Sequence, residues 1–199
     1  MARKIDHERR KSEIAARAVR LFSQVGYENV SLIMVAAASG VSRTALYRYF
    51  CSKRELMDAA IHAVTDGLAR DASRILLTRG SAVSKLEAIC HQVTNVMFEN
   101  KSFLIAVFDF VIGRVRTGGD MTNVLEEFTF GTRDAIRRLV EYGKRRGEFA
   151  AVLQPERAVD ILYSEFESCA MRIVLGTERD ARAARVRFTD IIRAIAAWR

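Results

Sequence analysis

The chain has 199 residues, of which 50% are apolar and 28% charged, so it can bury a core and stay in solution. Eleven Gly and one Pro are too few for a sandwich or barrel of many short strands. No apolar run reaches the roughly 18–20 residues of a transmembrane helix. The basic start lacks the apolar stretch of a signal peptide, so we expect a cytoplasmic protein.

Three cysteines without a C-x-x-C pair indicate neither a disulfide framework nor a structural zinc site. We interpret Cys51, Cys90 and Cys169 as buried free thiols, and we expect no metal and no cofactor.

The net charge of +8 is unevenly distributed along the chain. Residues 1–56 hold 11 Lys/Arg and 5 Asp/Glu, whereas residues 57–199 hold 21 and 19. A short basic module joined to a nearly neutral body indicates a polyanionic partner, either nucleic acid or a membrane surface. Composition does not choose between the two.

Apolar residues recur at helical spacing along nearly the whole chain, which predicts an all-α fold of about nine helices. Ile14, Ala18 and Phe22 belong to the stripe of a first helix that ends at Gly26. Short helices follow from Ser31 to Ser39 and from Ser42 to about Phe50, and Ser52 with Glu55 forms the capping box of a fourth. The expected long helices are 53–79, 82–98, 102–114, 121–146, 155–175 and 179–199.

Residues 31–50 have the spacing of a helix-turn-helix. Ala36 is small where two helices cross, and Gly40 can adopt the positive φ of a sharp turn. Val41 and Leu46 pack the second helix onto the first. The opposite face of that helix carries two Arg, and an exposed helix of this size fits the DNA major groove.

The stretch from Ile14 to Leu56 resembles the DNA-binding domain of the TetR family of bacterial transcriptional regulators. The matching pattern is I-A-A…L-F…G-Y…S-x-x-x-V-A-x-x-S-G-V-S-x-x-x-L-Y-x-Y-F-x-S-K-x-x-L. Departures are mild: Ser31 replaces a frequent Thr, Ser39 a frequent Ala, and Cys51 occupies a variable position. The resemblance implies an all-α homodimer with a DNA-binding domain at 1–56 and an effector-binding and dimerisation domain at 57–199.

The candidate DNA-binding residues lie in and around this motif. Arg43 and Arg48 either bind base edges or contact phosphates. Tyr47 resembles the family's phosphate-binding Tyr, whereas Tyr49 shares the Leu46 face and either binds phosphate or packs in the core. Lys53 opposes the macrodipole of the fourth helix, which favours phosphate binding. The full set is Ser31, Ser42, Arg43, Thr44, Ala45, Tyr47, Arg48, Tyr49 and Lys53. A basic arm of Arg3, Lys4, Arg9, Arg10 and Lys11 either contacts DNA or is solvated.

The segment Phe103–Ile112 is apolar at nine of its ten positions, so we expect a helix buried on all sides at the centre of the body. Its Phe and Met content favours an apolar or aromatic effector, although each residue alone is equally explained as core. Asp109 either contacts an effector, pairs with an Arg or reaches solvent. The candidate effector site comprises Met97, Phe98, Phe103, Ala106, Val107, Asp109, Phe110, Met121, Phe128 and Phe166.

Two apolar stripes near the end of the chain suit either an intramolecular core or a four-helix dimer interface. The candidate interface comprises Val159, Leu162, Phe166, Ile173, Phe188, Ile191 and Ile195.

The resulting hypothesis is a repressor that a small effector releases from a palindromic DNA operator. Alternatives are an effector-independent or activating regulator, a membrane-surface protein, or an enzyme. The enzyme alternative lacks support because G-x-S-x-G, P-loop and G-x-G-x-x-G motifs are absent. The apolar stripe of the first helix is used by the N-terminal core, which argues against a membrane-surface role.

Overall fold

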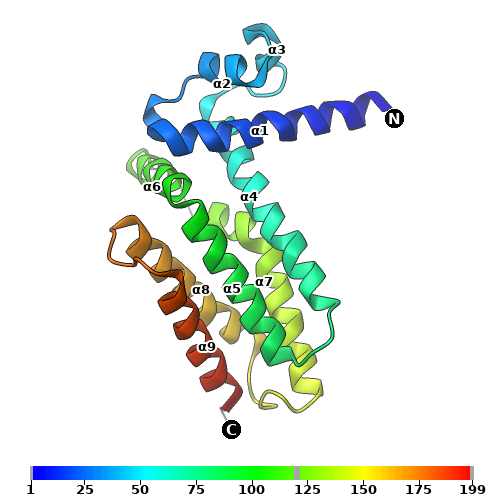
Figure 1. Cartoon of the computed structure of the whole chain (residues 1–199). Helices are drawn as coiled ribbons and strands as arrows, with labels where there is room; N and C mark the ends of the chain where they lie inside the picture. The colour runs from blue at the N-terminus through cyan, green and yellow to red at the C-terminus, as the bar shows by residue number, and fades with distance from the viewer. Residues whose placement is uncertain (1, 119–121, 198–199) are drawn as a thin grey trace. The chain divides into compact units, whose positions relative to one another are not determined.

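The structure is a computed structural model that describes residues 2–118 and 122–197, with the side chains of residues 7–118 and 129–197. These described residues form nine α-helices and no strand, which confirms the all-α fold (Figure 1). The helices are α1 (Ala2–Asn29), α2 (Leu32–Ser39), α3 (Arg43–Tyr47), α4 (Lys53–Leu76), α5 (Ala82–Glu99), α6 (Lys101–Arg116), α7 (Thr122–Arg145), α8 (Pro155–Val174) and α9 (Ala181–Ala197).

The chain divides into two compact units. The N-terminal unit comprises Met1–Thr65 and Asn100–Phe128, and the C-terminal unit comprises Asp66–Glu99 and Thr129–Arg199. This division by packing differs from the division at residue 56 that the sequence motif predicted. The difference arises because α6 packs with the N-terminal helices and because α4 contributes residues to both units.

The apolar stripe of α1 forms one wall of the N-terminal core. Ile14 and Phe22 are buried, together with Leu46 of α3 and Leu56 of α4. At Gly26 the backbone takes φ 76° and ψ 167°, which interrupts the helix where the sequence predicted its end. A further turn then reaches Asn29. The stripe therefore fixes α1 against the short helices that carry the motif.

Helix α6 packs on α1, so it does not form the centre of the C-terminal unit. Phe103, Ala106 and Phe110 are buried in the N-terminal core, whereas Ile105 and Ile112 are exposed. The expectation of a helix buried on all sides is therefore wrong. A run of apolar residues predicts burial, but only the neighbouring helices decide which side of it is covered.

The core of the C-terminal unit lies between α5, α7, α8 and α9. It includes Leu86 and Ile89 of α5, Ile136 of α7, Leu162 of α8 and Phe188 of α9. Two close approaches fix the helix ends: Gly143 lies so near Phe149 and Ala82 that a Cβ there would be 2.4 Å and 2.8 Å from their nearest side-chain atoms. Glu148 accepts hydrogen bonds from the backbone N–H groups of Ala82 and Val83 and so caps α5 from a distant part of the chain.

The residues predicted to form a dimer interface are buried within the single chain, and all but Ile173 belong to this core. Six of the seven are at most 5% exposed within the single chain, and Ile191 is partly buried against the same core. They therefore match the intramolecular alternative and are not available to a second chain. The set is Val159, Leu162, Phe166, Ile173, Phe188, Ile191 and Ile195. A dimer interface on α8 and α9 has to use the outward faces of these helices.

Polar contacts join α5 to α9 at four-residue steps along both helices. Glu87 forms an ion pair with Arg193 at 3.5 Å, and the Nε2 atom of His91 lies 3.1 Å from the Thr189 hydroxyl. The Arg185 guanidinium donates to the side-chain oxygen of Asn95 at 2.9 Å. Residue numbers rise along α5 as they fall along α9, so the two helices run antiparallel.

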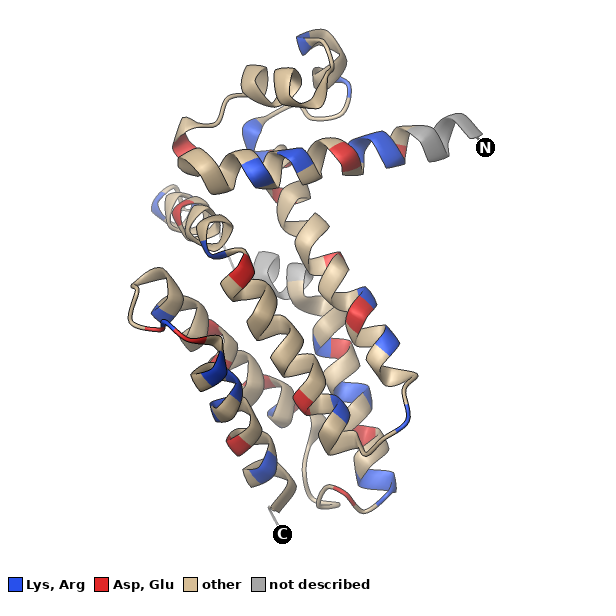
Figure 2. Ribbon diagram, viewed as in Figure 1, with Lys and Arg blue, Asp and Glu red and all other residues tan. Residues whose placement is uncertain are grey.

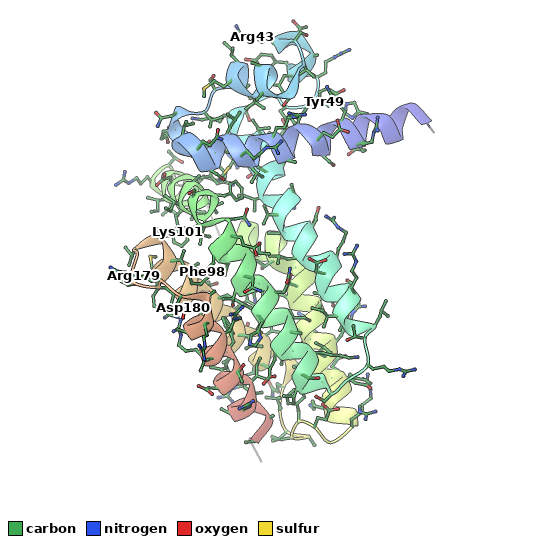
Figure 3. The ribbon with its side chains drawn as sticks, viewed as in Figure 1. Arg43, Tyr49, Phe98, Lys101, Arg179 and Asp180 are labelled. Carbon is green, nitrogen blue, oxygen red and sulfur yellow. The ribbon has the colours of Figure 1, made fainter. Side chains whose placement is uncertain are left out.

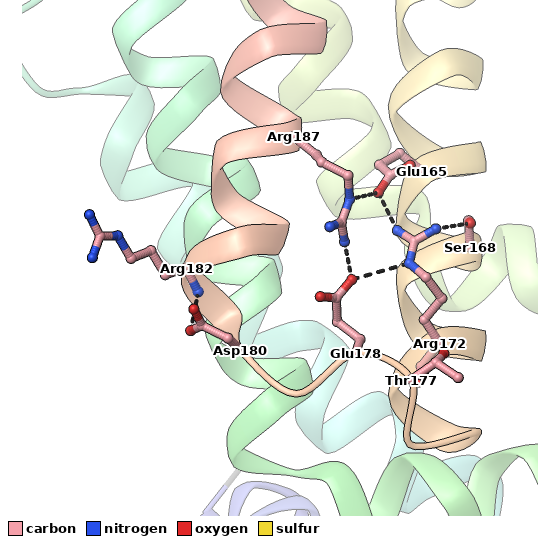
Figure 4. A network of polar contacts seen from close by, with 8 residues as sticks. All are labelled: Glu165, Ser168, Arg172, Thr177, Glu178, Asp180, Arg182 and Arg187. Carbon is pink, nitrogen blue, oxygen red and sulfur yellow. Dashed lines mark hydrogen bonds and ion pairs between the residues drawn. The ribbon is translucent and has the colours of Figure 1, made fainter.

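Four charged residues form a closed ring of ion pairs between α8, the following loop and α9 (Figure 4). The Arg172 guanidinium lies 2.6 Å from Glu165 and 3.1 Å from Glu178. Arg187 contacts the same two carboxylates, at 3.2 Å from Glu165 and closely at Glu178. Glu178 is 8% exposed, so its charge depends on these partners rather than on water.

Two of the three cysteines fit the interpretation as buried thiols, and one does not. Burial raises the pKa of the Cys90 and Cys169 thiols, so both are unreactive at neutral pH. Cys51 is exposed, contrary to expectation, because it lies in the turn between α3 and α4. In the part of the chain that the structure describes, no helix combines the length and the apolar character needed to cross a bilayer.

Candidate nucleic-acid interface

The turn between α2 and α3 has the left-handed backbone that the motif requires. Gly40 takes φ 63° and ψ 35°, and its N–H bonds to the carbonyls of Ala36 and Ala37. The N–H of Val41 donates to the Ala36 carbonyl at 3.0 Å. A Cβ at Gly40 would meet no atom within 4 Å, so glycine is required by its positive φ rather than by space.

Serine hydroxyls cap three successive helices of this region. Ser31 accepts from the N–H of Met34 in α2, and Ser42 accepts from the N–H of Ala45 in α3 at 3.1 Å. Ser52 accepts from the N–H of Glu55, whose carboxylate accepts from the N–H of Cys51. These contacts match the predicted caps. They fix the directions of α2, α3 and α4 locally, without help from distant residues.

Helix α3 is shorter than predicted. It ends at Tyr47, because the N–H of Tyr49 donates to the Leu46 carbonyl at 2.8 Å and tightens the last turn. Leu46 has no exposed surface and locks the helix onto α2.

The outward side of α3 and its last turn presents Arg43, Thr44, Tyr47 and Arg48, all of which are exposed. Figure 3 labels Arg43 on this helix. The Arg43 guanidinium lies 5.7 Å from the centre of the Tyr47 ring, and Ala45 is half-buried beside them. This face carries two cations, a hydroxyl and an aromatic ring, and it is suited to hydrogen bonds with base edges and phosphates.

Tyr49 lies apart from this face. Its ring is half-buried and stacks on the His7 imidazole of α1, with the ring centres 4.7 Å apart. It also packs against the N-terminal core. This position favours the packing alternative for Tyr49, while Tyr47 keeps an exposed ring.

Lys53 has an internal role that the sequence did not reveal. Its ammonium donates to the carbonyls of Tyr27 and Glu28 at 3.2 Å and 3.1 Å, and it lies 4.5 Å from the centre of the Tyr27 ring. A cation at the carbonyl end of α1 explains the placement that seemed unfavourable for α4 alone. The side chain stays 28% exposed, and its third N–H remains for another acceptor.

The residues predicted as a basic arm lie in α1, and Arg10 and Lys11 have partners within the unit. Arg10 donates to the Ser39 carbonyl at 3.3 Å, and Lys11 lies 3.8 Å from Glu55. Arg17, which the sequence analysis did not single out, donates to the Ala38 carbonyl at 3.0 Å. The spacing of seven residues between Arg10 and Arg17 was the available signal for a shared face. Arg3 and Lys4 have side chains outside the described residues.

Charge on the motif is therefore concentrated at its edges. Helix α2 carries no charged residue and leaves Ile33 and Met34 exposed, whereas cations flank it on α1 and α3 (Figure 2). Burial, and then the charges of Glu28 and Asp58, raise the pKa of Tyr27, so its ring is neutral beside Lys53.

The predicted effector residues are distributed over both units. Phe103, Ala106 and Phe110 lie in the N-terminal core with Val107 against it, and Asp109 is exposed. Met97 and Phe166 belong to the C-terminal core, and Phe98 is half-buried. Met121 and the side chain of Phe128 lie outside the described residues. The effector site stays a prediction.

An open groove of about 400 Å³ runs along α4 in the C-terminal unit and was not predicted. Its lining comprises Asp66, Ala69, Arg70, Ser73 and Arg74, at positions that recur on one helix face. The lining includes three charged residues and none of the predicted effector residues.

The arrangement of α1 to α4 defines a helix-turn-helix protein. Residues 14–60 match the family described as bacterial regulatory proteins, tetR family. An HTH-type transcriptional regulator of Mycobacterium tuberculosis, Rv1255c, is 30% identical over 117 residues, which cover 56% of each chain. The chain thus spans about half the length of the curated relatives it matches.

Solved structures share the fold over nearly the whole chain. A TetR-family transcriptional regulator from Rhodococcus sp. superposes with a TM-score of 0.78 at 19% identity, covering 94% of this chain and 98% of its own. The Bacillus subtilis regulator FadR, solved in complex with stearoyl-CoA, has a TM-score of 0.74 at 14% identity with the same coverage. The family model thus matches the helix-turn-helix part of the chain, and the solved structures share its all-α fold.

Proposed function

We propose that this chain binds double-stranded DNA through α3 and acts as a homodimeric transcriptional repressor. The observation that carries the proposal is the exposed set of Arg43, Thr44, Tyr47 and Arg48 on a helix that Ser42 caps and Leu46 locks in place. A rigid helix that presents cations and hydrogen-bond donors is what major-groove recognition requires. The match of residues 14–60 to the tetR family model supports the same role.

The DNA test is a selection from a randomised duplex pool, followed by anisotropy measurements at several salt concentrations. We expect enrichment of a palindrome with half-site centres roughly 34–36 Å apart, or a multiple of that distance. Affinity should fall steeply with salt, because phosphate contacts release counterions. Equal binding to the enriched and scrambled duplexes contradicts sequence-specific regulation.

The second part of the proposal is a small apolar or aromatic effector that weakens operator binding. The Phe and Met residues among the predicted effector residues support it, as does the stearoyl-CoA bound by the structurally similar FadR. A thermal-shift screen of apolar compounds identifies ligands, because binding raises the melting temperature. Operator affinity is then measured with each ligand. If every ligand leaves it unchanged, the alternative of an effector-independent regulator is favoured.

The homodimer is the third part of the proposal. The buried stripes of α8 and α9 are unavailable, but Met171 and Leu175 at the end of α8 and Val186 of α9 are 45%, 67% and 52% exposed. Apolar side chains at these positions are suited to cover one another in a second copy of the chain. Light scattering should give twice the mass of one chain, and Val186→Glu should lower it. A wild-type monomer at micromolar concentration contradicts this part.

A further inference from the structure

Tyr27 connects three helices of the N-terminal unit. It follows the break at Gly26 in α1, and its ring is half-buried. On one side the ring lies 4.5 Å from the Lys53 ammonium at the start of α4. On another side its centre lies 5.1 Å from that of the Phe110 ring of α6, with an angle of 60° between the planes.

The Lys53 ammonium is held at this position by three neighbours. The carbonyls of Tyr27 and Glu28 accept two of its hydrogen bonds, and the ring of Tyr27 provides the negative face of its π system. The Glu28 carboxylate is 3.7 Å away but itself 78% exposed, so it constrains Lys53 weakly. The position of the Tyr27 ring and backbone therefore sets the position of the ammonium.

The Tyr27 ring is in turn held by α6. Phe110 is 2% exposed and cannot move without its neighbours in the core. The Arg114 guanidinium lies 5.8 Å from the centre of the Phe110 ring, so the chain of contacts runs Lys53, Tyr27, Phe110, Arg114. All four residues belong to the N-terminal unit.

We propose that Tyr27 is a positioning residue for DNA binding: it holds the Lys53 ammonium for a phosphate contact, and Phe110 makes that contact depend on the position of α6. The inference rests on the proposed function, because it assigns the remaining N–H of Lys53 to DNA. A purely structural role for Tyr27 would affect the folding of the unit, whereas the proposed role affects DNA affinity only through the Lys53 ammonium. A displacement of α6 then changes phosphate contacts without a change in α3.

The test is a double-mutant cycle on the duplex that the wild-type chain enriches from the randomised pool. We expect Tyr27→Leu to weaken binding about 5-fold and to reduce the salt slope by about one unit, as Lys53→Ala does. In the Lys53→Ala background, Tyr27→Leu should add nothing. Tyr27→Phe keeps the ring and should bind as the wild type does. A role in folding alone would leave the salt slope unchanged.

Helix α6 is tested with a matched pair of substitutions. Phe110→Leu removes the ring beside Tyr27, whereas Phe103→Leu makes the same change at a buried position of the same helix that is not a ring neighbour of Tyr27. We expect Phe110→Leu to weaken binding about 3-fold only when Lys53 is present, and Phe103→Leu to leave the salt slope unchanged. Circular dichroism checks that each variant is folded. If Tyr27→Leu does not fold, the double-mutant cycle with Lys53→Ala is measured with Phe110→Leu in its place.

Two results overturn the inference: additive effects of Tyr27→Leu and Lys53→Ala, or equal effects of Phe110→Leu and Phe103→Leu. If the wild-type chain enriches no duplex, the proposed function is contradicted instead. The selection is carried out before any variant is made, so the two failures can be told apart.

Discussion

The two units of the chain use their charged side chains differently. In the N-terminal unit, single cations bind the carbonyl ends of helices: Arg10 and Arg17 at α2, and Lys53 at α1. In the C-terminal unit Lys85 and Lys144 also bind carbonyls, but the ring around Glu178 pairs its cations with carboxylates that are only 8% and 15% exposed. The carboxylates near Arg10 and Lys53, those of Glu13 and Glu28, are 44% and 78% exposed, so water screens these ion pairs. The contrast shows how a fold can keep positive charge beside a polyanion while it uses the same side chains for stability.

The largest expected effect is the loss of a core ring in the C-terminal unit. Phe188→Ala should lower the free energy of unfolding by about 3–5 kcal/mol, because it leaves a cavity at a position without exposed surface. Asp190→Ala changes an exposed position of the same helix and is the control. Urea unfolding measures both. Similar losses would contradict the inward assignment of Phe188.

Next in size is the ring of ion pairs. Glu178→Gln keeps the shape but leaves Arg172 and Arg187 with one carboxylate between them, so stability should fall by about 2 kcal/mol. Glu167→Gln, exposed on α8, serves as the comparison and should change little. Thermal unfolding of the two variants at equal ionic strength is the measurement. If Glu178→Gln and Glu167→Gln lower the melting temperature equally, the ring of ion pairs does not stabilise the C-terminal unit.

The N-terminal cations should affect DNA binding in two distinct ways. Arg43→Ala should cost about 1–3 kcal/mol on the enriched duplex and relax sequence preference, because its side chain is exposed on α3 and can reach a base edge. Lys53→Ala should weaken enriched and scrambled duplexes alike and lower the salt slope by about one unit. Anisotropy on both duplexes tests this. Equal weakening of both by Arg43→Ala would assign Arg43 to the phosphates.

The smallest expected effect is the loss of one helix cap. Ser42→Ala removes the acceptor for the Ala45 N–H and should cost about 1 kcal/mol of stability. Ser164→Ala, at an exposed position inside α8, is the matched control with no cap to lose. Chemical denaturation followed by circular dichroism compares them. An unchanged unfolding midpoint for Ser42→Ala would mean that packing of Leu46 alone fixes α3.

Local signals predicted the N-terminal unit well. Ser31, Ser42 and Ser52 cap the helices that the sequence assigned to them, and Gly40 adopts the left-handed turn. These contacts span three or four residues, so their geometry follows from residue type and spacing. The predicted α3 was too long. The tight turn that ends the helix is made by a hydrogen bond between the backbone atoms of Tyr49 and Leu46, and the residue types there do not predict it.

Contacts between distant segments were predicted less well. The sequence showed that α6 is apolar, but not that α1 covers one side of it and leaves Ile105 exposed. The stripes of α8 and α9 were consistent with a core or a dimer interface, and burial assigns them to the core. An apolar stripe predicts that one face of a helix is buried, but it does not predict which surface buries that face.

The sequence by itself determined the all-α fold, the positions of the nine helices in the described residues, and the helix-turn-helix with its exposed Arg43 and buried Leu46. Periodicity and caps are properties of short segments, so they can be read along the chain. Only the tertiary structure decided that Lys53 binds the end of α1, that Phe110 reaches Tyr27 and that Glu178 closes a ring of charges. Each of these contacts joins residues that are neighbours only because helices pack, and packing depends on all the surfaces of the chain at once.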